Sequence, residues 1–124
     1  FDKVTGLLTK IIDGAKELAV SGPHMNYRTK GDKLTYSSNH INSYGKNWQL
    51  KKFTYELKDN VAIIGLKGSY NKIKASFDIR IDMNGNITTS YSYKKLPKEN
   101  VRELGVSYNF DPVFDSLYWE RNTY

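Results

Sequence analysis

Strict alternation of apolar and polar residues between positions 73 and 93 predicts two neighbouring β-strands. In the segment Ile73–Ile81 every second side chain is apolar, and the intervening ones are Lys, Ser, Asp or Arg. The next segment repeats the pattern with Ile87, Thr89, Tyr91 and Tyr93. Because successive side chains of a strand point to opposite faces, each segment has one apolar face. The pair predicts an antiparallel sheet with one solvated face and one face that a second layer must cover.

The length of the connecting loop decides how these two strands pair. Asn84-Gly85 is typical of a two-residue turn, which would pair Ile81 with Thr88 and put the two apolar rows on opposite faces. A three-residue loop at positions 83–85, with its glycine in the left-handed conformation, instead pairs Ile81 with Ile87 and keeps both rows on one face. We therefore predict the longer loop.

The predicted register places Phe77 directly opposite Tyr91. We expect both rings to be buried on the shared apolar face, where burial of each contributes roughly 1.5–3 kcal/mol. The hairpin thus predicts part of a hydrophobic core.

Other segments also show strand-like patterns, although less regularly. The alternation of Trp48–Lys58 is interrupted at Lys52 and Phe53, and Val61–Tyr70 contains two glycines, which inside a strand often mark a bulge or a close backbone approach. The predicted strands outside the hairpin are 33–38, 48–58, 61–70, 101–110 and 114–119.

The first twenty residues fit two different structures. Apolar residues at helical spacing (Leu7, Leu8, Ile11, Ile12, Ala15, Leu18 and Ala19) slightly favour an amphipathic helix. The same residues also fit two strands, 7–12 and 16–20, with a turn at Asp13-Gly14, because glycine costs a helix interior about 1 kcal/mol and suits a turn. In either case we expect Ser21-Gly22-Pro23 to end the element.

Composition indicates one domain without a disulfide framework. The chain has 124 residues, no cysteine and 14% aromatic residues, a share that favours strands. No apolar run reaches the roughly 20 residues of a membrane-spanning helix, so we expect no membrane span. The N-terminus has no secretory signal pattern, and the compartment of the protein, periplasmic, secreted or other, stays open.

The net charge of +6 is distributed rather than concentrated. A nucleic-acid-binding face usually combines clustered basic residues with interleaved aromatic residues. Here the lysines occur in small groups at strand ends and outward positions, which predicts a solvated surface and no nucleic-acid partner.

No motif in the chain predicts catalysis, a metal site or a cofactor. His24 and His40 are isolated, and we expect both on the surface or in loops. No nucleophile-elbow or phosphate-binding glycine pattern occurs. Carboxylate pairs are available for glycoside cleavage, but they lie at predicted turns beside basic residues, where solvated surface is the ordinary role; they are Asp111/Asp115 and Glu99/Glu103.

Two further features have a structural interpretation. Asn86-Ile87-Thr88 matches a glycosylation sequon, which we interpret as part of the hairpin loop. Three aromatic residues, Trp48, Tyr44 and Trp119, could stack on sugar rings or bases, but core packing is the commoner use of such side chains.

Motifs near both ends of the chain resemble one known domain. The opening Phe1–Leu8, the segment Gly14–Leu18 and the segment Ser21–Arg28 resemble the start of the C-terminal β-sandwich, or small-chain, domain of family 2 glycoside hydrolases of the β-galactosidase type. Later segments agree in order and spacing: Leu96-Pro97, then Arg102-Glu103-Leu104-Gly105-Val106-Ser107-Tyr108, then Phe114-Asp115-Ser116-Leu117-Tyr118-Trp119.

The resemblance implies an all-β antiparallel sandwich of the galactose mutarotase type. It favours strand–turn–strand over helix at the N-terminus, and it implies that residues 1–124 are the first half of a larger C-terminal domain. The end at Tyr124, in what reads as the middle of an element, agrees with such a fragment.

The resemblance also implies a function for the parent protein. The chain would be a non-catalytic, carbohydrate-associated segment of a hydrolase that cleaves terminal β-galactosides, with the catalytic glutamates on a separate barrel domain as its partner. Asn26 and Arg28 lie in a predicted loop after Gly22-Pro23 and match a segment that faces the barrel, which implies contact with carbohydrate or with the barrel. The segments after Arg28 and after Trp119 depart from the family pattern, so the exact sugar stays open. The alternative is a stand-alone carbohydrate-binding or adhesive sandwich.

Overall fold

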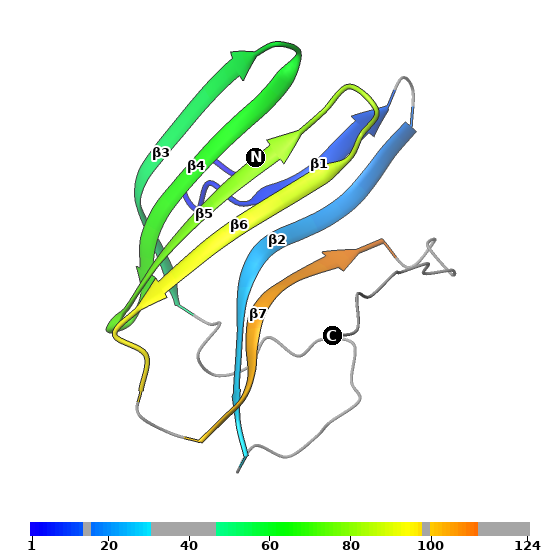
Figure 1. Ribbon diagram of the computed structural model, residues 1–124. Helices are drawn as coiled ribbons and strands as arrows, with labels where there is room; N and C mark the ends of the chain where they lie inside the picture. The colour runs from blue at the N-terminus through cyan, green and yellow to red at the C-terminus, as the bar shows by residue number, and fades with distance from the viewer. Residues whose placement is uncertain (14–15, 31–46, 98–99, 112–124) are drawn as a thin grey trace, which may run out of the picture.

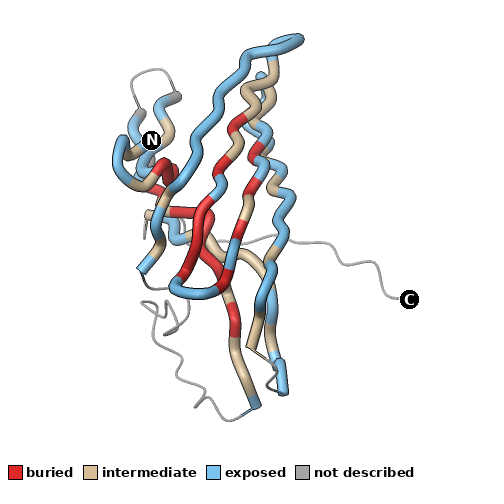
Figure 2. Tube along the Cα trace, turned by 90° about the vertical axis from the view of Figure 1, so that its left-hand side faces the viewer, coloured by how far each residue is buried: buried red, intermediate tan, exposed pale blue. Residues whose placement is uncertain are grey.

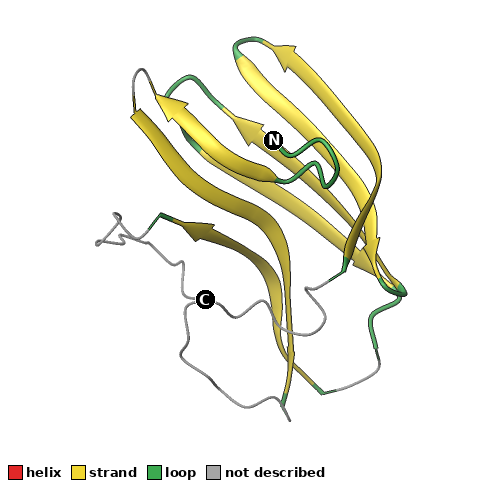
Figure 3. Ribbon diagram, turned by 180° about the vertical axis from the view of Figure 1, so that it is seen from behind, coloured by secondary structure: helices red, strands yellow, loops and turns green. Residues whose placement is uncertain are grey.

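The protein forms two antiparallel β-sheets. The computed structural model describes residues 1–13, 16–30, 47–97 and 100–111, and within these ranges it contains seven strands and no helix (Figure 1; Figure 3). This confirms the predicted all-β, antiparallel sandwich class. The strands are β1 (Leu8–Asp13), β2 (Lys16–Thr29), β3 (Trp48–Lys58), β4 (Val61–Tyr70), β5 (Ile73–Ile81), β6 (Ile87–Lys94) and β7 (Val101–Phe110).

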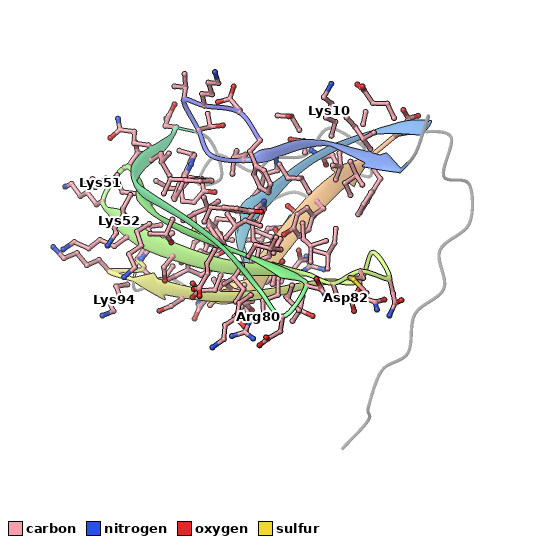
Figure 4. All side chains as sticks on the ribbon, turned by 90° about the horizontal axis from the view of Figure 1, so that it is seen from above. Lys10, Lys51, Lys52, Arg80, Asp82 and Lys94 are labelled. Carbon is pink, nitrogen blue, oxygen red and sulfur yellow. The ribbon has the colours of Figure 1, made fainter. Side chains whose placement is uncertain are left out.

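The sheets stack as two layers with the core between them. One sheet has the order β1-β2-β7 and the other β3-β4-β5-β6, and the view from above shows one sheet lying over the other (Figure 4). Buried positions concentrate on β2, β4 and β5, the inner strands (Figure 2). The core consists chiefly of Met25, Tyr27, Ile64, Leu66, Tyr70, Ile73, Phe77 and Ile79.

The β5–β6 hairpin has the predicted register and loop. Ile81 pairs with Ile87, and the Asp82 N–H donates to the Asn86 carbonyl at 3.1 Å, which leaves a three-residue loop. Gly85 has φ +80°, the left-handed conformation that was expected there. The Asp82 carboxylate accepts hydrogen bonds from the Asn86 side chain, the Asn86 N–H and the Asn84 N–H, which lower the pKa of Asp82.

One burial prediction for this hairpin is wrong. Phe77 is completely buried, but its partner Tyr91 is 46% exposed. Phe77 lies on β5 between two strands, and its ring contacts those of Trp48 and Tyr93. Tyr91 lies on β6, the edge strand of the sheet, so no further strand flanks it on one side. The alternation of apolar and polar residues shows on which face of the sheet a residue lies, but not how far its strand is from the edge of the sheet.

The N-terminal residues are strands, as the resemblance implied, and the helical spacing was misleading. β1 pairs with β2 so that Asp13 lies opposite Lys16; residues 14–15 of the predicted turn lie outside the described ranges. The expected end at Ser21-Gly22-Pro23 is wrong, because β2 continues to Thr29.

A β-bulge explains how β2 passes its proline. The pairing of β2 with β7 shifts between Ser21 and His24, and a bulge is one of the few places in a sheet where a residue without an N–H is tolerated. Gly22 has φ +148°, and a Cβ there would lie 2.6 Å from the Tyr108 ring. Glycine is therefore required at this position.

A second bulge explains the irregular pattern of β3. Leu50 pairs with Gly68 and Lys52 with Lys67, so Lys51 is an extra residue. Phe53 consequently returns to the inner face, as the apolar pattern of the strand requires. Gly68 allows the predicted close approach, because a Cβ there would meet the Trp48 ring at 2.5 Å.

The N-terminal segment forms a tight turn that lies against the β3–β6 sheet. The Asp2 carboxylate accepts hydrogen bonds from the Thr5 N–H, the Thr5 hydroxyl and the Val4 N–H. These bonds lower the pKa of Asp2, those from Thr5 most. The Trp48 Nε1 donates to the Thr5 carbonyl at 2.8 Å, which ties this turn to β3.

Polar contacts also join the two layers. The Met25 N–H on β2 donates to the Tyr70 hydroxyl on β4 at 3.2 Å, and burial raises the pKa of Tyr70 to about 12. The Tyr93 hydroxyl on β6 donates to the Gly105 carbonyl on β7 at 2.8 Å. The predicted strands 33–38 and 114–119 lie outside the described residues.

Candidate functional site

The two residues predicted to contact carbohydrate or a barrel lie together on β2 and share one partner. The Asn26 amide nitrogen is 3.3 Å from Oε2 of Glu103 on β7, and the Arg28 Nε is 3.4 Å from the same oxygen. The Arg28 side chain is 19% exposed and that of Glu103 is 39% exposed. These three residues form a half-buried polar cluster, here called the Glu103 cluster.

Strand pairing creates this cluster. Arg28 lies directly opposite Glu103, and Asn26 lies opposite Gly105. The sequence interpretation placed Asn26 and Arg28 in a loop after Pro23, which is wrong because β2 continues through the bulge. The cluster is therefore held on two paired strands, and such sites are more precisely positioned than loop sites.

The cluster offers a mixed set of donors and acceptors. Asn26 can both donate and accept, Arg28 has five N–H donors in a fixed fork, and the Glu103 carboxylate only accepts. Neither long side chain is fully buried, so a ligand or a neighbouring protein surface can reach unused donors. Such a combination suits hydroxyl groups or a carboxylate. The cluster contains one carboxylate rather than a pair, so it does not suggest cleavage of a glycosidic bond by acid–base catalysis.

Glu103 was not predicted as a partner of Arg28. The sequence interpretation noted it as part of a resemblance motif and as a member of a carboxylate pair with Glu99, a residue outside the described ranges. The partnership depends on the pairing of β2 with β7, strands far apart in the sequence. Only the opposite charges of Arg28 and Glu103 hinted at it.

His24 is buried on β2 rather than exposed or in a loop, which corrects that expectation. Its Nε2 lies 2.8 Å from the Ser21 hydroxyl, and burial lowers the pKa of His24. In the recorded contacts of the described residues the ring has no carboxylate partner, so the third member of a nucleophilic triad is missing. The Ser21–His24 contact stabilises the bulge region. His40 lies outside the described residues.

The remaining candidates have structural roles or lie outside the described ranges. Trp48 packs against the core, with its ring 4.9 Å from that of Tyr70. The Asn86 amide nitrogen, to which a glycan would be attached, donates to Asp82 at 2.8 Å. Tyr44, Asp115 and Trp119 are not among the described residues.

The described ranges contain neither a candidate metal-binding group nor a helix that could span a membrane. No three residues of the His, Cys, Asp and Glu types come together there in a way that could hold a metal ion. The described ranges also contain no helix of the length and apolar character needed to cross a bilayer. Comparison of the chain with family models, with curated proteins and with solved structures gave no match.

Proposed function

We propose that this chain is a non-catalytic, carbohydrate-associated β-sandwich segment of a family 2 glycoside hydrolase. Its full-length parent would hydrolyse terminal β-galactosides with catalytic residues on a separate barrel. The motif resemblance supplies the family and the substrate class. The observation that carries the proposal is a row of substantially exposed apolar residues on the inner face of β3.

This row, here called the β3 row, consists of Phe53, Tyr55 and Leu57. These residues are 43%, 60% and 65% exposed, respectively, and the Phe53 ring has an edge contact with the ring of Phe1. Residues directly opposite each other in a ladder lie on the same face. Their partners on β4 are Leu66, Ile64 and Ala62, which belong to the core or pack against it. The β3 row thus continues the core-facing side of the sheet into solvent. Contiguous apolar surface of this kind is typical of an interaction site, which supports a segment that packs against more protein.

Contacts between the motifs also support the proposal. Gly22 of one motif packs against the ring of Tyr108 of another, and Arg28 pairs with Glu103 across β2 and β7. The motifs lie far apart in the sequence but act together in space. Such contacts are expected if the motifs together define one fold, as they would in a sandwich family.

The Glu103 cluster is the proposed point of contact with carbohydrate or with the barrel. Asn26 and Arg28 carry the donors, and Glu103 orients both side chains. A group that displaced or extended these hydrogen bonds would need acceptor oxygens, which sugar hydroxyls and carboxylates both provide.

The β3 row gives the decisive experiment. Tyr55→Ser together with Leu57→Ser should hardly change the melting temperature of the isolated chain, because both side chains are already largely exposed. In the full-length parent the same change should lower the melting temperature by several degrees. Val4→Ser, which changes an apolar residue that is 81% exposed, is the matched control. Equal effects in chain and parent would contradict the proposal.

Activity supplies the second part of the test. The parent should cleave an aryl β-galactoside and the isolated chain should not. In the parent, Arg28→Ala should lower kcat/KM, whereas Arg28→Lys, which keeps the charge but not the fork, should lower it less. An isolated chain that binds polysaccharide tightly, together with a parent reading frame that encodes no barrel, would instead establish the stand-alone alternative.

A further inference from the structure

A basic depression lies on the outer face of the β3–β6 sheet, opposite the core. Its volume is about 330 Å³, and its polar lining comes from all four strands. Lys51 and Lys94, from the two edge strands, lie at the same end of the sheet in the view from above, whereas Asp82 lies towards the other end (Figure 4). The polar lining residues are Lys51, Lys67, Lys74, Lys94, Ser76 and Ser92.

Sheet register brings these residues together. Lys74 on β5 lies directly opposite Lys94 on β6, and Ser76 lies between Lys67 on β4 and Ser92 on β6. The extra residue of the β3 bulge, Lys51, adds a fourth ammonium group at the β3 side. Neighbouring strands are about 4.8 Å apart, so four strands span roughly 14 Å. The lysines therefore surround a compact area.

The lining of the depression is positively charged, and the nearest carboxylate along β5, that of Asp78, lies outside it. No carboxylate contributes to its lining. The two ion pairs recorded among the described residues, Lys10–Glu17 and Arg28–Glu103, belong to the other sheet. Like charges directly opposite in a ladder are destabilising, and Lys74–Lys94 is such a pair. The free protein thus holds an arrangement that a bound anion would relieve.

The lining also indicates the class of anion. Lysine ammonium groups bind sulfate and phosphate groups as point charges, and the serine hydroxyls can donate to further oxygens. The lining contains no aromatic residue, so the stacking that dominates binding of single-stranded nucleic acid is missing. The volume lies in the range of small-ligand sites, about 300–1,000 Å³, which favours a compact ligand over a polymer.

We propose that this depression binds a small ligand carrying several sulfate or phosphate groups. The site is independent of the proposed hydrolase function, because it lies on the opposite face of the sheet from the β3 row. Two probes separate the sources of the oxyanion groups: inorganic tripolyphosphate and the sulfated sugar sucrose octasulfate.

The test is calorimetric titration of the chain with each probe at constant ionic strength. At least one probe should bind with one-to-one stoichiometry. Since each exposed lysine contributes roughly a two- to fivefold factor, Lys67→Gln with Lys74→Gln should weaken binding about tenfold. Lys58→Gln, at the far end of β3, removes one charge outside the depression, against two in the double variant, and should change the affinity less than twofold.

The melting temperature of the double variant without ligand shows whether a loss of binding reflects a loss of folding. The double variant should melt at the same temperature as the unchanged chain or slightly higher, since it removes like-charge repulsion. Equal weakening by Lys58→Gln, or no binding of either probe, would overturn the proposal. So would tighter binding of duplex DNA that persists in the double variant, because that result would indicate a diffuse basic surface.

Discussion

Removal of the Phe77 side chain should be among the most damaging single changes in the described core. The ring is completely buried on β5, with the rings of Trp48 and Tyr93 5.7 and 6.0 Å away in edge-on geometry. Truncation of a buried phenylalanine to alanine typically costs about 3–5 kcal/mol. A domain of this size has a free energy of unfolding of about 5–15 kcal/mol, so Phe77→Ala removes a large part of it.

Tyr91 is the matched control, because it lies directly opposite Phe77 on the same face. It is 46% exposed, so roughly half of its burial energy is available, about 0.8–1.5 kcal/mol. Tyr91→Ala should therefore cost about a third as much as Phe77→Ala. Phe77→Leu should fall between them and provides a folded comparison if the alanine variant is too unstable.

Urea unfolding followed by far-ultraviolet circular dichroism measures these differences. Tryptophan fluorescence is less suitable, because Trp48 contacts Phe77 and its signal would change with the mutation. The dependence of free energy on urea should stay constant across the series. On heating, Phe77→Ala should melt roughly 10–20 °C lower than the unchanged chain. A Tyr91→Ala loss equal to that of Phe77→Ala would refute the edge-strand explanation.

Two other predictions use glycine and histidine positions. Gly85→Ala should cost about 1–2 kcal/mol from its left-handed backbone alone, since an added Cβ has free space around it. Gly6→Ala should cost more, because it has φ +68° and its Cβ would also lie 3.0 Å from Leu66; equal losses in urea unfolding would contradict this steric reasoning. Burial lowers the pKa of His24 below its ordinary 6.5, so the unfolded chain takes up a proton at a higher pH than the folded one. Stability from this group is therefore complete above pH 6.5 and is lost as the pH falls below it. His24→Gln should flatten that part of the dependence of melting temperature on pH, and an unchanged slope would show that another group is responsible.

The hairpin of β5 and β6 was predictable because its information is local. The alternation of side chains between the two faces of a strand decided between two loop lengths, since only the three-residue loop keeps Ile81 and Ile87 on the same face. The exposure of Tyr91 was not predictable in this way. It depends on the order of strands in the sheet, which alternation within one segment does not contain.

The course of β2 shows a different limit. Ser21-Gly22-Pro23 has the composition of a terminator, and local rules favour a break there. The strand continues because β7 pairs with it on both sides of the bulge, from Val20 to Thr29. The Glu103 cluster depends on the same long-range pairing. Its Asn26 and Arg28 were found by resemblance, and its carboxylate was not identified as their partner.

A single extra residue in β3 connects the two proposed surfaces. Without the bulge, that is, with Lys51 paired as an ordinary strand residue, Phe53, Tyr55 and Leu57 would point to the outer face beside the lysines. With it, the apolar row lies on the inner face and Lys51 itself reaches the basic depression. The bulge therefore separates apolar surface from positive charge, one on each side of the sheet. Because the two surfaces face opposite directions, a partner on the β3 row and an anion in the depression can bind at the same time, and the failure of either proposal leaves the other intact.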